Sequence, residues 1–229
     1  MTPPILALDI ETVPQRDYTD LSPTVKEYVD SRLEQINANR DEKHHWDYIK
    51  FASLDGDLGK VVCISLGYYT EDRGTIRLKS ACDTDEKKVL DNFNNVIRTH
   101  RGDYLHYNGL SFDIPFILQR MAYNGLAPED NRITSLARYR TSPHFDLMQI
   151  WANWDYRKTK PLDVLADIVG VPNPKDELDG SMVNQFYSEN RLDEIKRYCE
   201  LDTATVLNIY LHLIELKPVL SLEQYEFSQ

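Results

Sequence analysis

Cysteine and long apolar runs are both scarce in this sequence. Its three cysteines, Cys63, Cys82 and Cys199, are an odd number and stand far apart along the chain. None of their spacings is that of a zinc site, and we expect no disulfide framework, which is typical of a protein in a reducing cytoplasm. The sequence has no run of about 18 apolar residues that could span a membrane, and its N-terminus lacks the pattern of a signal peptide. We therefore expect a cytoplasmic protein with no membrane partner.

Positive charge is scarce as well. The 229 residues include 26 Lys and Arg against 37 Asp and Glu, which gives a net charge of −11. This balance argues against a broad basic clamp on a nucleic-acid backbone, but it does not exclude a narrow site where metal ions supply the positive charge. The apolar content of 41% is that of an ordinary soluble globular protein.

Hydrophobic periodicity divides the chain into strands followed by alternating strands and helices. The pattern predicts strands near 5–9, 61–69, 75–79, 104–107 and 144–145, and helices near 23–36, 85–97, 113–124, 146–154, 162–169 and from 192 onward. This order is typical of an α/β domain with a mixed sheet covered by helices. We interpret residues 15–59 as an insertion with too few apolar residues for a core of its own, within a single domain over residues 1–229.

The first candidate site stands at the end of the first strand, where the sequence reads ILALDIETVP. On a strand, residues i and i+2 share a face and are roughly 6.6–6.8 Å apart along the chain, so Asp9 and Glu11 point the same way. Two neighbouring carboxylates repel each other unless a cation lies between them. Ligands of such sheets gather at the carboxyl ends of strands, where this pair is expected.

The second candidate is Asp113 in the stretch YNGLSFDIP, and two interpretations of it stand. Asp113 is a favoured N-cap for a helix with Pro115 in its first turn, and Phe112 and Ile117 would form a hydrophobic staple. Alternatively, Asp113 belongs to a site, and Gly109 lets the backbone turn or approach another group closely.

The third candidate interrupts the apolar stripe of the last helix at Asp202. The stripe consists of Leu192, Ile195, Cys199, Val206, Ile209 and Leu213. A carboxylate in such a stripe is costly to bury unless it is paired or bound to metal. A local ion pair with Lys196 or Arg197 is the alternative, but neither lies three or four positions away, whereas Tyr198 does.

Together these stretches supply four carboxylates from three elements: Asp9, Glu11, Asp113 and Asp202. Hard oxygen ligands of this kind suit Mg²⁺ or Mn²⁺ and not structural zinc. Two such ions about 3.5–4 Å apart are the usual clamp for a phosphoryl displacement. Four negative charges would balance them.

At this point the sequence resembles a known family. In order, Asp-x-Glu, Asn-x₃-Phe-Asp and Tyr-x₃-Asp are similar to the three exonuclease motifs of the DEDD superfamily, and the tyrosine is typical of its DEDDy branch. The chain resembles in particular the stand-alone bacterial 3′–5′ exonucleases related to the proofreading domain of family B DNA polymerases. Further matching stretches are KVVCISLGYY, FILQR, KPLDVLADIVGVP and YCELDTATVLNIY. The resemblance covers nearly the whole chain except roughly residues 15–59.

The resemblance implies a ribonuclease H-like α/β fold, in which a mixed five-stranded sheet is flanked by helices and an insertion follows the first strand. It also implies that four carboxylates hold two Mg²⁺ or Mn²⁺ ions and that a tyrosine orients the attacking water: Asp9, Glu11, Asp113, Asp202 and Tyr198. The implied substrate contacts are the Thr12 backbone, Asn108, Phe112 and Lys160. The histidine branch is excluded, because the position it requires is Arg197.

Three functions follow from these observations. The leading one is a metal-dependent 3′–5′ exonuclease on the 3′ ends of single-stranded DNA. The second is an exoribonuclease on short RNA, since nothing in the sequence shows how a ribose 2′-hydroxyl is treated. The third is a catalytically silent module that binds nucleic acid or protein, which the complete set of carboxylates argues against. The oligomeric state is not determined by the sequence.

The region between the second and third motifs carries weaker signals. We interpret Asp146 as a helix N-cap, with proximity to substrate as the minority alternative. Trp151 and Trp154 are expected in the core. The basic cluster of Arg157, Lys158 and Lys160 is expected at the surface, where the family's layout makes a phosphate contact an equal alternative.

Overall fold

A computed structural model describes residues 4–172 and 180–228 of the chain. The strands are β1 (Leu6–Pro14), β2 (Gly59–Thr70), β3 (Thr75–Cys82), β4 (Tyr104–His106), β5 (His144–Asp146) and β6 (Tyr225–Glu226). The helices are α1 (Pro23–Asn37), α2 (Tyr48–Ser53), α3 (Glu86–Ile97), α4 (Asp113–Tyr123), α5 (Leu147–Trp151), α6 (Leu162–Val169), α7 (Val183–Ser188) and α8 (Leu192–Leu213). Among these described residues, no helix combines the length and apolar character that a membrane span needs.

The strands form one mixed sheet in the order β5-β4-β1-β2-β3-β6. β2 pairs antiparallel with both β1 and β3, whereas the β1–β4, β4–β5 and β3–β6 pairs are parallel. The predicted α/β class is confirmed, but the expected count of five strands is wrong. The sixth strand is the two-residue β6, which is too short to give a periodic signal in the sequence.

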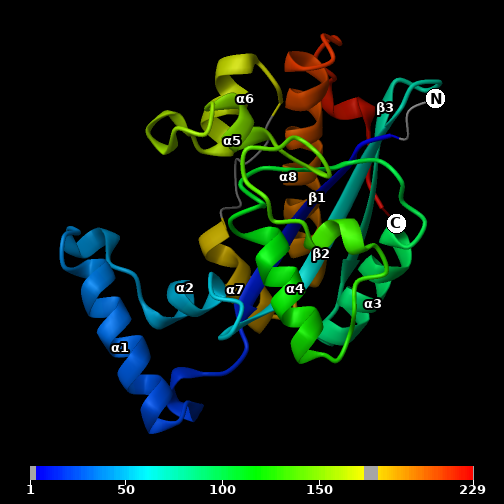
Figure 1. The fold of residues 1–229 in the computed structure, drawn as a ribbon. Coiled ribbons are helices and arrows are strands. Elements are labelled where there is room, and N and C mark those ends of the chain that lie inside the picture. The colour runs from blue at the N-terminus through cyan, green and yellow to red at the C-terminus, as the bar shows by residue number, and fades with distance from the viewer. Residues whose placement is uncertain (1–3, 173–179, 229) are drawn as a thin grey trace.

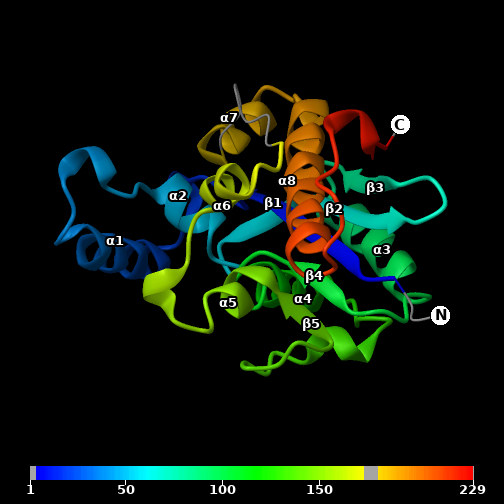
Figure 2. The same cartoon turned by 90° about the horizontal axis from the view of Figure 1, so that it is seen from above.

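Helices cover both faces of this sheet, as Figure 1 and Figure 2 show. Leu6, Leu8 and Ile10 of β1 pack in one cluster with residues of α3 and α4. Ala7, on the opposite face, packs against α6 and α8. Because side chains alternate along a strand, Asp9 and Glu11 share the face of Ala7 and lie beneath α8.

Helix ends follow local sequence signals in most places. α6 has the predicted bounds and ends at Gly170, which has a left-handed φ of 78°. α5 is shorter than expected and ends at Trp151. Asn153 and Trp154 have positive φ angles of 52° and 58°, so the chain cannot continue as a right-handed helix there.

Residues 15–58 form an arm that extends away from the sheet and carries α1 and α2 (Figure 1). The expectation that this insertion has too few apolar residues for its own cluster is wrong. Leu21, Val29 and Phe51 are buried together. The partly buried side chains around them are Tyr18, Val25, Leu33, Ile36, Trp46, Tyr48 and Leu58. These apolar residues are spread from Tyr18 to Leu58, so their association was not visible as a periodic pattern.

A buried ion pair between α3 and α4 is hydrogen bonded to both ends of the arm. Arg120 of α4 is 2% exposed and makes two hydrogen bonds of 2.8 Å with the carboxylate of Glu86. The same guanidinium donates to the Gly56 carbonyl and to the Gln15 side chain. Glu86 also accepts the backbone N–H of Val61. This network holds the start and the end of the arm against α3 and α4.

Cys63 and Cys82 form a disulfide, contrary to the expectation from the sequence. The two residues are 19 positions apart but stand directly opposite each other in the β2–β3 register, with a Cα–Cα distance of 4.1 Å. The pairing depends on the strand register and not on spacing in the sequence. Cys199 is the free, buried cysteine.

Candidate active site

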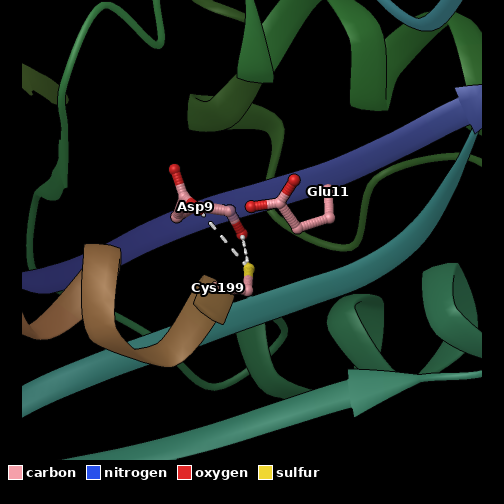
Figure 3. A group of neighbouring side chains, drawn as sticks. All are labelled: Asp9, Glu11 and Cys199. Carbon is pink, nitrogen blue, oxygen red and sulfur yellow. Dashed lines mark hydrogen bonds between the residues drawn. The ribbon is translucent and has the colours of Figure 1, made fainter. Parts of the chain in front are cut away.

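The carboxylates of Asp9 and Glu11 lie together beneath α8. One oxygen from each, with the sulfur of Cys199, falls within a group whose atoms are all within 4.8 Å of one another. Figure 3 shows the two side chains on β1 beside the Cys199 thiol. The β1–β2 register shifts between Glu11 and Thr12, so the regular strand pairing breaks immediately after this pair.

The Cys199 thiol is a hydrogen-bond donor in this group. Its sulfur lies 3.4 Å from the backbone carbonyl of Asp9 and 3.5 Å from its carboxylate. Burial and the adjacent charges of Asp9 and Glu11 raise the pKa of the thiol well above its usual range. The side chain therefore remains a thiol at neutral pH and does not offer a thiolate to a metal.

Asp113, at the start of α4, lies near Asp9 in the same acidic cluster. It is the first residue of the helix, and Phe112 occupies the N-cap position without a side-chain cap bond. The N-cap interpretation of Asp113 is therefore wrong, and Phe112 contacts the ring of Phe116 at 5.6 Å. The Asp113 carboxylate accepts its own backbone N–H and also that of Ile10, which lies between the two acidic residues of β1. β4 pairs with β1 only at Leu6 and Ala7, which leaves this N–H available.

Asp202 and Tyr198 complete the cluster from α8. Asp202 is 8% exposed and occupies the gap between two hydrophobic groups of this helix. Ile195 and Cys199 belong to one group, whereas Val206 and Ile209 belong to the other. Tyr198, one turn earlier, is also buried, and its hydroxyl is hydrogen bonded to Asp202. The predicted apolar stripe and its interruption are confirmed.

The electrostatics of the cluster favour a cation. Burial and then the charges of Asp113, Asp202 and Glu11 raise the pKa of Asp9 well above its usual range. Burial and the neighbouring charges of Asp146 and Asp202 raise the pKa of Asp113 to about 7. The donor set consists of carboxylate oxygens, which suits Mg²⁺ or Mn²⁺ better than zinc.

A cavity of about 490 Å³ opens beside the acidic residues. Its lining includes Glu11, Thr12 and Phe112 together with residues of the arm, among them Ile49, Ser53 and Leu54. The Thr12 hydroxyl donates to the Ser53 carbonyl at 2.5 Å, so this side chain ties α2 to β1. No pattern in the sequence indicated that the arm would line this cavity.

Two predicted substrate contacts lie outside the walls of this cavity. Asn108 has a φ of 67°, and its side-chain oxygen accepts the amide of Gln149 at 3.3 Å. Lys160 is exposed, and its backbone carbonyl accepts the hydroxyl of Tyr107 at 2.8 Å. Asn108 thus lies in the segment between β4 and Asp113, and Lys160 is hydrogen bonded to Tyr107 of the same segment.

A buried polar network supports this segment and was missed by the sequence analysis. The Asp146 carboxylate accepts the backbone N–H groups of Asn108 and Leu110 at 3.0 and 3.1 Å, in addition to capping α5. Burial alone would raise the pKa of Asp146, but the adjacent His106 ring and the N–H groups of Gln149 and Leu110 lower it. The only signal in the sequence was the capping preference of Asp146, which is confirmed but describes part of its role.

Two histidines extend this network into the core. His144 Nε2 donates to the carbonyl of Ile133 at 3.1 Å, because a carbonyl can only accept. Burial lowers the pKa of His144 to about 4, so its Nδ1 is free of a proton and accepts from His106 Nε2 at 3.2 Å. His106 Nδ1 faces Asp146 at 3.6 Å. A Cβ on Gly109 would come within 2.5 Å of the His106 ring, so the predicted close backbone approach is confirmed.

These features define the class of the protein. The fold is ribonuclease H-like and similar to the structure of the family B DNA polymerase from the hyperthermophilic archaeon Pyrobaculum calidifontis, with a TM-score of 0.61 and 19% sequence identity. The match covers 93% of this chain and 25% of the polymerase chain, so the protein corresponds to about a quarter of that enzyme's length. A comparison with curated proteins finds no match.

The family follows from the sequence itself. Residues 51–229 match the family described as "predicted 3′–5′ exonuclease related to the exonuclease domain of PolB". The chain belongs to this family. The expected relation to the proofreading domain of family B polymerases is confirmed, and the arm before residue 51 lies outside the match.

Proposed function

We propose that residues 1–229 act as a single metal-dependent domain that removes nucleotides from the 3′ ends of single-stranded DNA. Asp9, Glu11, Asp113 and Asp202 would hold two divalent cations, Mg²⁺ or Mn²⁺. The membership of the chain in a 3′–5′ exonuclease family supports the reaction class. The structural observation that carries the proposal is the convergence of these four carboxylates from β1, α4 and α8.

The charge of the cluster supports the metal dependence. Without cations, the protein retains protons on Asp9 and Asp113 at a pH where exposed carboxylates have lost them. Bound cations would neutralise this charge and would supply the polarisation that activates water and stabilises the leaving oxygen. Divalent ions should also stabilise the folded protein by mass action.

Tyr198 would position the attacking water and would not remove its proton. Burial and the charges of Asp202 and Glu11 raise the pKa of the phenol, so it stays protonated at neutral pH. Its single O–H donates to Asp202, so its oxygen can accept a hydrogen bond from the water, but the protonated phenol is a poor general base. The bond to Asp202 holds the hydroxyl against the acidic cluster.

Other residues would bind the terminal nucleotide. Thr12 and Phe112 line the cavity beside Glu11, which supports a role for the Thr12 backbone and Phe112 in contacting the sugar and base. Asn108 lies in the segment between β4 and Asp113, and Lys160 is hydrogen bonded to Tyr107 of the same segment, so we assign to them the next part of the strand.

The direct test uses 5′-labelled oligonucleotides of DNA and RNA with Mg²⁺, Mn²⁺ or a chelator. We expect single-nucleotide shortening from the 3′ end of single-stranded DNA, no reaction in the chelator, and no cleavage of circular single strands. Faster degradation of RNA would replace the DNA assignment by that of an exoribonuclease. A lack of hydrolysis of either polymer under all metal conditions would favour the silent binding module.

Single substitutions on α8 separate the proposed roles. Tyr198→Phe removes one hydrogen bond and should lower the single-turnover rate by roughly 10- to 10³-fold, or about 1.4–4 kcal/mol of barrier. Asp202→Ala removes a proposed metal ligand and should cost more. Asp193→Ala, on the exposed side of the same helix, is the matched control. Near-normal activity of Asp202→Ala would contradict its assignment as a ligand.

A further inference from the structure

Basic and aromatic side chains gather on one exposed part of this acidic protein. Residues 132–160 contain six Lys or Arg and two Asp, whereas the whole chain has a net charge of −11. We define the Arg138–Lys158 surface by the partly or fully exposed side chains of Arg138, Tyr139, Arg140, Trp154, Tyr156 and Lys158. These residues flank β5 and α5, at the edge of the sheet (Figure 2).

The positive charge of this surface is not neutralised from within the segment. Of its two aspartates, Asp146 is fully buried and Asp155 is paired with Arg157. In the part of the chain that the structure describes, Arg138, Arg140 and Lys158 have no acidic side chain at ion-pair distance. They are therefore available to an external anion.

The aromatic side chains of this surface are exposed and held in place. Tyr139 and Tyr156 are 75% and 81% exposed. Trp154 was expected in the core but is only partly buried, and its ring contacts that of Tyr139 at 5.0 Å. Both residues have positive φ angles, 62° and 58°, which are rare for bulky side chains. The loop before β5 and the loop after α5 thus bring their aromatic rings into contact.

The segment of residues 132–160 is hydrogen bonded to residues 107–110, which lead into Asp113. Asp146 lies between the two loops and accepts N–H groups from Asn108 and Leu110. The hydroxyl of Tyr107 donates to the carbonyl of Lys160, two residues after Lys158. The surface is therefore fixed relative to the turn that leads into Asp113.

Proteins that bind single strands without sequence preference combine cationic side chains for phosphates with aromatic faces for bases. Because the rest of this chain is strongly acidic, a phosphodiester strand can be attracted only where the local charge is reversed. We propose that the Arg138–Lys158 surface binds the part of a single-stranded nucleic acid that extends outside the acidic cluster, by phosphate contacts and base stacking. This inference rests on the proposed function, since it assigns a substrate-binding surface to the same reaction.

Binding without hydrolysis tests the surface directly. The probe is a fluorescently labelled oligo-dT of 20 nucleotides, titrated by anisotropy in chelator over a range of KCl concentrations. Each phosphate contact on a single strand contributes about 0.7 to the slope of log K against log salt. The Arg138→Ala/Arg140→Ala variant should therefore have a slope less steep by about 1.4 and bind about 25-fold more weakly at 0.1 M salt.

Stacking is tested separately at Tyr139. Tyr139→Ala should weaken binding by about 5- to 160-fold without changing the salt slope, and Tyr139→Phe should retain most of the affinity. The control variant Arg73→Ala/Lys88→Ala removes two exposed cations on the β2–β3 turn and on α3, outside the surface. Its affinity should match that of the unmodified chain.

The reaction itself is read with a substrate too small to reach the surface, the p-nitrophenyl ester of thymidine 5′-monophosphate with Mn²⁺. No hydrolysis of this ester by the unmodified chain would contradict the proposed function, while the anisotropy data still decide the surface. If the Arg138→Ala/Arg140→Ala variant binds oligo-dT with the affinity and salt slope of the control, the inference is overturned. In that case the surface serves another kind of partner, such as a protein.

Discussion

Asp113→Asn tests whether the acidic cluster holds more negative charge than the protein tolerates without cations. The ordinary pKa of 3.8 describes the unfolded chain, whereas burial and neighbouring charges raise the pKa of Asp113 to about 7 in the folded protein. Between these values the folded state keeps a proton that the unfolded state has lost. Stability should therefore fall as the pH rises from about 4 to about 7, and the loss is complete above that range.

The size of the effect follows from the two pKa values. The difference between 3.8 and about 7 corresponds to an upper limit of about 4 kcal/mol, at about 1.4 kcal/mol per pKa unit. For a chain of this length, 1 kcal/mol shifts the melting temperature by about 2–4 °C. In chelator, we expect the unmodified protein to melt at least about 5 °C lower at pH 8 than at pH 5.

Asparagine keeps the shape of the side chain and an oxygen that can accept the N–H of Ile10, but it does not titrate. Asp113→Asn should therefore lose the part of this pH dependence that Asp113 contributes, while the part from Asp9 remains, and it should melt higher than the unmodified protein at pH 8 in chelator. Adding Mn²⁺ at pH 8 should raise the melting temperature of the unmodified protein more than that of the variant. Differential scanning calorimetry at pH 5 and pH 8 measures both effects.

The exposed Asp167 of α6 provides the matched control. Asp167→Asn makes the same chemical change outside the cluster and should keep the full pH dependence. If Asp113→Asn and the unmodified protein have the same pH dependence in chelator, Asp113 does not carry a raised pKa in the folded protein.

Three further substitutions test the parts that support the cluster. Asp146→Asn removes the charge that faces His106 and should lower the single-turnover rate at saturating oligonucleotide by about 10-fold, because it disturbs the segment that leads into Asp113. An unchanged rate would exclude a positioning role. Gly109→Ala places a methyl group against the His106 ring and should destabilise the protein by about 1–3 kcal/mol in urea unfolding, whereas an unchanged midpoint would contradict the close approach. Arg120→Ala leaves the buried Glu86 carboxylate without its cation and should lower the free energy of unfolding by about 3–5 kcal/mol in the same assay. A decrease of less than about 1 kcal/mol would contradict a stabilising role of this ion pair.

Local pattern was sufficient for much of the fold and for the components of the candidate site. Asp202 was visible because it interrupts a helical apolar stripe, and the pair of Asp9 and Glu11 because side chains alternate along a strand. These signals depend on residues within a few positions of each other, so the sequence contains them directly. The bounds of α6 were predictable for the same reason, since Gly170 ends the helix locally.

Tertiary structure decided the features whose partners are distant along the chain. Capping preference favoured Asp113 as an N-cap, but the N–H of Ile10, more than 100 positions earlier, takes its carboxylate. The Cys63–Cys82 bond depends on strand register, and β6 is defined by its neighbour β3. The network of Asp146 and the histidines joins strands that are adjacent only in the sheet. Which of these contacts form depends on all the groups that folding brings together, so they cannot be predicted from a short window of neighbouring residues.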